Sequence, residues 1–152
     1  MMNVEKAEIA CVIDSDIVID YIRGKKYAIE ILQDNVEKGT VVISTITHFE
    51  VYRGMRTGEE RHTDSFLDTL LSIDVDVELA REGGRLMNGL RSKGITVDAA
   101  DAILAATAIR LKAPLISNNV SRYPFHDLKL IRGKDLGGDS YIKERRRGYK
   151  IK

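Results

Sequence analysis

The sequence predicts an α/β fold built around a parallel sheet. Short, wholly apolar runs alternate along the chain with longer segments whose apolar residues recur at helical spacing, as in strands joined by helices. One longer segment, "AILAATAI" at 102–109, is apolar on nearly all sides, which indicates a helix buried between layers. With 152 residues, of which 43% are hydrophobic and 31% charged, the chain suits one globular domain with a sizeable core.

Apolar runs and glycines mark the elements of the first half. The continuous run Ile9–Ile13 fits a strand buried on both faces, and segment 25–38 has apolar residues at helical spacing and stops at Gly39. In order, we expect a strand at Ile9–Ile13, helices at Ile17–Ile22 and Lys25–Lys38, a strand at Val41–Ile43, and a helix at Thr47–Met55 that ends near Gly58.

The second half continues the alternation. In order, we expect a helix at Glu59–Leu71, a short strand at Leu71–Ile73, helices at Asp76–Lys93 and Ala99–Lys112, a strand at Leu115–Ser117, and a candidate strand at Lys129–Ile131. The long helix stops at Gly94. The pair Gly83-Gly84 inside it lowers helix stability, which suggests a close packing contact at that point.

Charge and cysteine content exclude several classes of protein. The 24 basic and 23 acidic residues nearly cancel, and the single Cys11 rules out an internal disulfide framework or a Cys-rich zinc site. No signal-peptide pattern and no apolar run of membrane-span length is present, so we expect a cytoplasmic protein with no membrane partner. "KERRRGYKIK" holds six basic residues and one acid. We therefore expect one domain, 1–142, followed by a solvated basic tail, 143–152, with phosphate binding by the tail as the alternative.

Three aspartates interrupt the apolar run "CVIDSDIVIDYI" at 11–22. Asp14 ends the first expected strand, and ligands in open α/β sheets bind beyond the carboxyl ends of the strands. Asp16 precedes the short helix, so its favoured interpretation is an N-cap. Asp20 lies on that helix, and we expect it to be a solvated or salt-bridged surface group.

Acidic residues from two later segments lie near the same edge of the expected sheet. Thr47 and Glu50 have the spacing of a capping box, but the same geometry aims Glu50 at the strand ends, where Asp14 should lie. Asp98 and Asp101 open the buried helix and share a face, and Asp98 can cap it. Asp101 should lie against the core, where an unpaired carboxylate has a raised pKa or disfavours folding.

Three carboxylates from separate segments, Asp14, Glu50 and Asp101, are thus expected to converge at one edge of the sheet. Their mutual repulsion would be unfavourable without a cation, and an all-oxygen ligand set suits Mg²⁺ or Mn²⁺. Such a site supports metal-assisted attack of water on a phosphodiester.

These motifs resemble those of a known family, the PIN-domain ribonucleases, particularly the VapC-type toxins of prokaryotic toxin–antitoxin pairs. The match covers about residues 9–131. The first motif is "VIDSDIVIDYI", a strand ending in Asp followed by Ser, and the second is "VVISTITHFEVYRGM" with its metal-site Glu. The third, "DAILAATAIRLKAPLISNNV", is an Asp with an alanine-rich helix and a strand ending in Ser with Asn nearby.

The resemblance implies a three-layer α/β/α sandwich with a central parallel sheet, a homodimer, and Mg²⁺- or Mn²⁺-dependent endonucleolytic cleavage of RNA. Carried over by position, Asp14, Glu50 and Asp101 are the core acids, Ser15 and Ser117 match the small hydroxyl positions, and Asn119 matches the asparagine of the last motif. If the chain is a toxin, a small antitoxin should block the site by inserting a basic group among the acids.

One position departs from the family pattern. Many members have a fourth acid after the last motif strand, whereas this chain reads "SNNVSRYPF" there. Three alternatives stay open: Asp98 supplies the missing metal ligand, three acids bind one metal, or the domain is inactive.

The resulting hypothesis assigns a role to each residue. Asp14 and Asp101 hold the metal, and Glu50 completes the site or deprotonates the attacking water. Ser117 and Asn119 position the scissile phosphate or a bound water. Candidates for contacts with the RNA backbone are Arg53, Arg56, Arg110 and Arg122.

Two rival interpretations remain. "CVIDSDIVI" also resembles the first motif of haloacid-dehalogenase-like phosphatases, with Asp14 as nucleophile and Asp16 as acid/base, but no late motif follows and Glu50 and Asp101 are left without a role. The second rival is a degenerate, non-catalytic PIN-like binding module, supported by the missing fourth acid.

Overall fold

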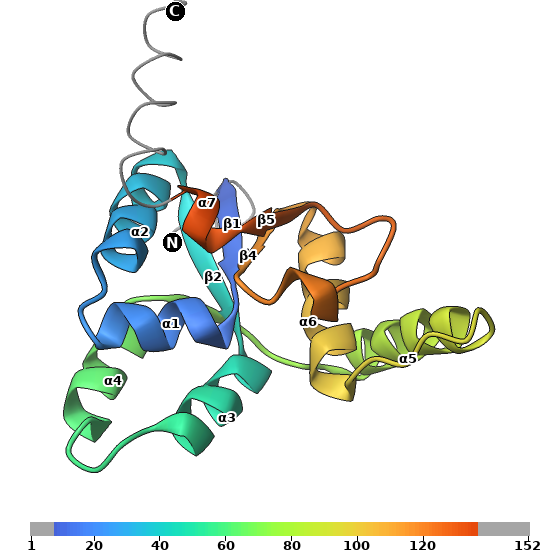
Figure 1. Ribbon diagram of the computed structural model, residues 1–152, viewed down its shortest axis with the longest axis horizontal. Helices are drawn as coiled ribbons and strands as arrows, with labels where there is room; N and C mark the ends of the chain where they lie inside the picture. Colours follow the sequence, from blue (N-terminus) through green and yellow to red (C-terminus); the bar gives the residue numbers. More distant parts are fainter. Residues whose placement is uncertain (1–7, 137–152) are drawn as a thin grey trace, which may run out of the picture.

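A five-stranded parallel sheet forms the centre of the molecule (Figure 1). The computed structural model describes residues 8–136. The strands are β1 (Ile9–Ile13), β2 (Thr40–Ser44), β3 (Leu71–Ile73), β4 (Leu115–Ser117) and β5 (Leu130–Arg132). Every expected strand is present. β2 is one residue longer at each end than expected, and β5 begins one residue later than the candidate range.

Helices connect the strands and cover both faces of the sheet. They are α1 (Ser15–Ile22), α2 (Lys26–Lys38), α3 (Thr45–Gly54), α4 (Glu60–Leu67), α5 (Val77–Arg91), α6 (Ala99–Leu111) and the short α7 (Gly133–Leu136). The 3-10 turn η2 (Val120–Arg122) and α7 were not expected, because segments this short carry no periodicity. α4 ends four residues early because the chain turns there before entering β3.

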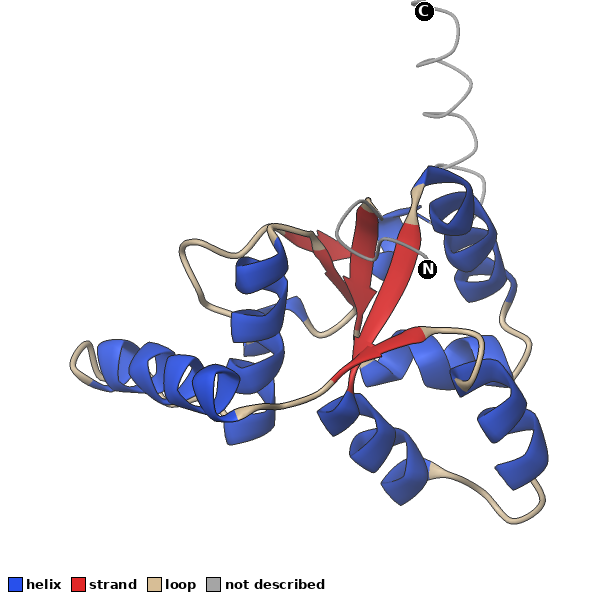
Figure 2. Ribbon diagram, turned by 180° about the vertical axis from the view of Figure 1, so that it is seen from behind, coloured by secondary structure: helices blue, strands red, loops and turns tan. Residues whose placement is uncertain are grey.

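Alternate residues of β1 serve two separate cores, which confirms the three-layer sandwich. Cys11 and Ile13 face a cluster with α1, α2 and α4, whereas Val12 faces a cluster built on the alanine-rich α6. Figures 1 and 2 show these helices on opposite sides of the sheet. Burial raises the pKa of the Cys11 thiol to about 12, so this cysteine is an inert core residue.

One glycine of the expected pair mediates the contact between α5 and α6. A Cβ built on Gly83 would lie 3.1 Å from Cγ1 of Ile103, whereas one built on Gly84 would meet nothing within 4 Å. The expected close contact is therefore confirmed for Gly83 alone.

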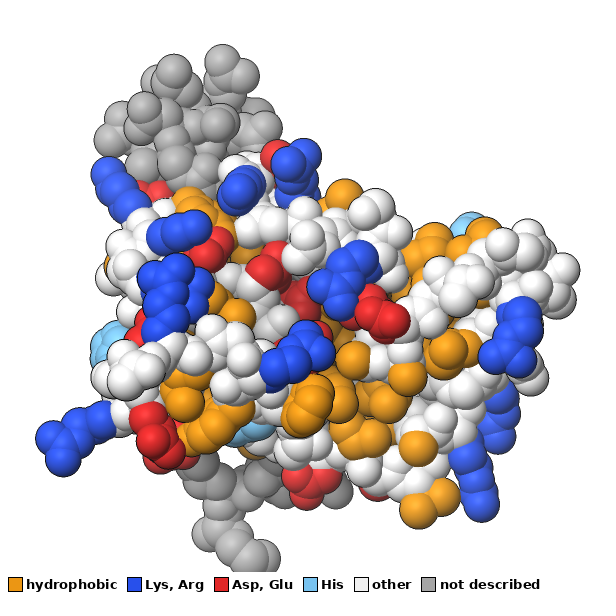
Figure 3. Space-filling view, turned by 60° about the horizontal axis from the view of Figure 1, so that its bottom comes forward, with side chains coloured by type: hydrophobic (Ala, Val, Ile, Leu, Met, Phe, Trp, Pro, Cys, Tyr) orange, Lys and Arg blue, Asp and Glu red, His pale blue; other side chains and the backbone are white. Residues whose placement is uncertain are grey.

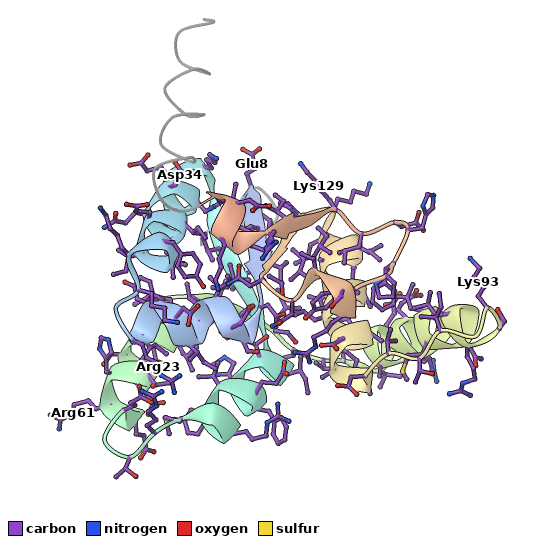
Figure 4. All side chains as sticks on the ribbon, in the orientation of Figure 1. Glu8, Arg23, Asp34, Arg61, Lys93 and Lys129 are labelled. Carbon is purple, nitrogen blue, oxygen red and sulfur yellow. The ribbon has the colours of Figure 1, made fainter. Side chains whose placement is uncertain are left out.

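The strand order is β3-β2-β1-β4-β5, so the chain winds outward from β1 in one direction and later returns to its other side. The carboxyl ends of β1 and β4 flank this switch point, where open α/β sheets place their ligands. Figure 4 shows Glu8 and Lys129 at the opposite edge of the sheet. Within residues 8–136, no helix is both long and apolar enough to cross a bilayer. The predicted basic tail, 143–152, lies outside the described residues.

Candidate active site

Asp14 directly follows β1 and caps α1. Its Oδ1 accepts a hydrogen bond of 2.7 Å from the Ser15 backbone N–H, and the residue is 2% exposed. The expectation that Asp16 is the N-cap is therefore wrong. An aspartate at either position can accept a capping hydrogen bond. The helix α1 begins at Ser15, two residues before the first apolar residue, Ile17, so Asp14 and not Asp16 stands at its start.

Two hydroxyl groups donate to the other oxygen of Asp14. Ser117, at the end of β4, donates at 2.8 Å, and Tyr123 donates at 2.6 Å. Burial first, and then the charge of Asp14, hold the pKa of Tyr123 far above its usual value, so its hydroxyl remains a donor. Tyr123 was not predicted to belong to the site. A hydroxylated aromatic residue close behind a strand end was the available signal, because a buried tyrosine hydroxyl nearly always finds a partner.

Asp16 ties α1 to the segment after β4. Its Oδ2 accepts a 2.8 Å bond from the Asn118 backbone N–H and a 3.2 Å bond from Nδ2 of Asn119, while Ile17 N–H donates to Oδ1. Burial, reinforced by the neighbouring charge of Asp14, raises the pKa of Asp16 to about 6. Asp20 forms an ion pair with Lys25 at 3.2 Å, which confirms that it is salt-bridged.

Glu50 lies inside α3, close enough to Asp14 and Asp101 to feel their charges. The cap of α3 is Ser44, whose hydroxyl accepts from Ile46 N–H, so the alternative of a capping box formed by Thr47 and Glu50 is excluded. Glu50 is 7% exposed, and Arg53 is 3.8 Å from its carboxylate. Burial raises the pKa of Glu50, and the negative charges of Asp14 and Asp101 raise it further.

Asp101 lies in the first turn of α6 and is 3% exposed. Arg122 donates two hydrogen bonds of 3.0 Å to the Asp101 carboxylate, from Nε to Oδ2 and from Nη2 to Oδ1. Burial raises the pKa of Asp101, and Arg122 opposes that rise. Asp98 begins the same helix without a side-chain capping bond. Its side chain is 79% exposed and 3.9 Å from Arg122, so it is not buried with the other three acids.

Figure 3 shows acidic side chains gathered in a hollow near the middle of one face, with basic side chains beside them. This view brings forward the lower side of Figure 1, where α1, α3 and α6 begin. Within residues 8–136, no three His, Cys, Asp or Glu side chains already stand in a metal-binding arrangement. The donor chemistry nevertheless fits a hard divalent cation, because Asp14, Glu50 and Asp101 are buried and Glu50 feels the charges of the other two.

The remaining candidate residues have specific partners. The Ser117 hydroxyl, besides donating to Asp14, accepts from Asn119 N–H at 3.0 Å, so both residues belong to the framework that holds Asp14 and Asp16. Among the arginines suggested for RNA contact, Arg53 and Arg122 flank the acids. Arg110 pairs with Asp76 at the start of α5, and Arg56 is exposed in the loop after α3.

A family model described as "PIN domain" matches residues 11–123, which include every acid of this site. Ribonuclease VapC19 of Mycobacterium tuberculosis is 34% identical over 119 residues, covering 77% of this chain and 95% of that protein. Ribonuclease VapC1 of Methanocaldococcus jannaschii is 29% identical over 122 residues, covering 80% of this chain and 84% of that protein.

Solved structures share the fold over most of the chain. VapBC2 from Rickettsia felis, bound to a DNA fragment from its promoter, superposes with a TM-score of 0.71 and 25% identity, covering 81% of this chain and 97% of that chain. DNA-bound VapBC from Salmonella typhimurium superposes with a TM-score of 0.72 and 22% identity, covering 82% of this chain and 98% of that chain.

Proposed function

Because the chain belongs to the PIN-domain family, we propose that it is an Mg²⁺- or Mn²⁺-dependent endoribonuclease and the toxin of a VapBC-type toxin–antitoxin pair. One observation carries the catalytic part of this proposal. Asp14, Glu50 and Asp101 come from three separate segments and are all buried, and the pKa of Glu50 is raised first by burial and then by the charges of Asp14 and Asp101. A divalent cation relieves that repulsion.

The residues of the site divide the work. Asp14, Glu50 and Asp101 would hold the cation, which supplies positive charge that lowers the pKa of water and offsets charge on the scissile phosphate. As the alternative to completing the ligand set, Glu50 would accept the proton of the attacking water, since it is a buried carboxylate beside the other two acids. Ser117 and Tyr123 hold the Asp14 carboxylate in one orientation. Asp98 remains a candidate ligand at the exposed rim.

The partners follow from the same assignment. The chain shares its fold with the toxin–antitoxin complexes named above and with one from Klebsiella pneumoniae, which supports a small antitoxin as partner. A basic group of that antitoxin would enter among the acids. RNA as substrate, a homodimer and a cytoplasmic location belong to the proposal as well.

Neither rival explains the site as well. In the phosphatase interpretation Asp16 is a proton donor, yet Asp16 accepts from two backbone N–H groups and joins α1 to the segment after β4. That interpretation also gives Glu50 and Asp101 no role. A non-catalytic module would retain the acids without binding a metal.

Cleavage of RNA by three variants tests the proposal. Asp14→Asn and Asp101→Asn should each lower the rate in Mg²⁺ or Mn²⁺ by at least about a hundredfold, because each removes a charged ligand. Asp16→Asn should retain most of the activity, whereas it would abolish a phosphatase. Circular dichroism verifies the fold of each variant. Full activity in folded Asp14→Asn or Asp101→Asn contradicts the nuclease assignment. Failure of the wild type to bind either metal at millimolar concentration favours the binding module.

A further inference from the structure

The turn η2 and the residue after it contact two of the three central acids. Arg122, the last residue of η2, holds both oxygens of Asp101, and Tyr123, the next residue, donates to Asp14. The segment 118–123 that forms this turn contains no acid of its own. The guanidinium of Arg122 therefore occupies the oxygens of Asp101 that a metal ion would have to reach.

The two anchors of this turn differ in how freely they can move. Tyr123 is buried and fixes the backbone against Asp14. The Arg122 side chain is 38% exposed, so its guanidinium can swing into solvent without unpacking the core. Arg53, the other cation beside the acids, is 3.8 Å from Glu50 and its side chain is more exposed. Arg122 is thus the main counter-ion of Asp101.

We propose that Arg122 is a built-in counter-ion that occupies Asp101 in the metal-free protein and is displaced when a divalent cation binds, which frees its guanidinium to pair with an RNA phosphate. This inference rests on the proposed function, because it takes Asp101 as a metal ligand. The bidentate contact uses both Asp101 oxygens, so metal and guanidinium compete for one carboxylate. Binding of either cation must weaken binding of the other.

Mn²⁺ binding to the full chain without RNA tests the competition, by calorimetry. Arg122→Gln should bind Mn²⁺ about tenfold more tightly than the wild type, which corresponds to about 1.4 kcal/mol. Arg122→Lys keeps the charge but loses the two-pronged contact, so it should fall between them. Arg61→Gln is the matched control. Arg61 lies on α4 and points away from the molecule (Figure 4), so its loss should leave the affinity unchanged.

Displacement itself has a direct readout in the Arg122 Nε–H signal of ¹⁵N nuclear magnetic resonance spectra, identified by its absence in Arg122→Lys. This proton should exchange slowly with water in the metal-free protein and rapidly at saturating Mg²⁺. If the signal stays protected at saturation, or if Arg122→Gln binds Mn²⁺ no more tightly than the wild type, the counter-ion role is wrong although the metal site stands. If neither protein binds metal, the proposed nuclease function fails with it. If Arg122→Gln does not fold, Arg122→Lys and the Nε–H signal still decide.

Discussion

The end of β1 and the start of α6 each place one buried carboxylate in the site, but they hold it by different chemistry. Within residues 8–136, the Asp14 carboxylate accepts only from neutral donors, namely the backbone N–H and hydroxyl of Ser15 and the hydroxyls of Ser117 and Tyr123. Asp101 is held by the charged guanidinium of Arg122. Burial alone would make the two positions look alike, since both are almost fully enclosed.

This difference gives the two carboxylates different partners. The neutral donors orient the Asp14 carboxylate, and they can stay in place when a cation arrives. The guanidinium offsets the charge of Asp101 and occupies both of its oxygens, so under the proposed exchange it would have to leave. In the proposed metal site, the Asp14 region would be a preformed half-site, and the Asp101 region a half-site that opens on exchange.

The largest expected effect concerns pH, because Asp14 has a second carboxylate, Asp16, beside it, and no ion pair of either residue is found in residues 8–136. The pKa of Asp16 is raised to about 6, so between about pH 4 and 6 the folded chain binds a proton that the unfolded chain has released. Stability should therefore fall as pH rises through this window, by up to about 3 kcal/mol. Urea unfolding in the presence of a chelator, from pH 4 to 7, measures the slope.

Variants assign this slope to one half-site or the other. Asp16→Asn should remove most of it, because the titrating group and its repulsion of Asp14 are both lost. Asp101→Asn should remove less, because Arg122 already opposes the rise in the pKa of Asp101. Equal slopes in the two variants would show that the half-sites do not differ in this way.

A smaller effect separates two neighbouring residues by the sign of their effects on metal binding. Tyr123→Phe removes a neutral donor to Asp14, so Mn²⁺ affinity should fall about tenfold, as is typical for groups that orient a ligand. Arg122→Gln should raise the affinity instead. Tyr52→Phe is the control, because the Tyr52 hydroxyl donates to Asp64 on the surface. Tighter binding by Tyr123→Phe would contradict the distinction between the half-sites.

The sequence predicted the strands well, and it predicted the placement of the acids because each adjoins an element with clear apolar patterning; their role as metal ligands stays a prediction. Asp14 follows the run Ile9–Ile13, and Asp101 opens the alanine-rich α6. Local choices were less accessible. Asp14 and Asp16 can both accept the capping bond, and the apolar pattern that begins at Ile17 favoured the wrong one.

The contacts made by η2 could not be predicted from the sequence. A three-residue turn has no period, and Tyr123 is 109 residues from its partner Asp14. Arg122 was expected to contact RNA. Its pairing with Asp101 could not be predicted, because a lone arginine in a loop does not show which acid the fold will bring to it. The sequence thus predicted the acid of the Asp101 half-site, whereas its counter-ion, Arg122, is visible only in the tertiary structure.

The smallest expected effect concerns the packing of α5 against α6, which supports the Asp101 half-site. The Asp14 half-site needs no such support, because β1 lies within the sheet. Gly83 lets α5 approach α6 at Ile103, two residues from Asp101. Gly84→Ala should stabilise the protein by about 1 kcal/mol, because the added methyl meets only solvent and alanine favours the helix. Gly83→Ala should destabilise it by about 1 kcal/mol, since its Cβ would lie only 3.1 Å from Cγ1 of Ile103 while already in van der Waals contact with the α6 backbone at 3.4 Å, so the Ile103 side chain would have to shift. Thermal unfolding of the pair provides the comparison. A stabilised Gly83→Ala would mean that α6, and Asp101 with it, can move away from α5 at little cost, and the Asp101 half-site would then be adjustable in its backbone as well as in its counter-ion.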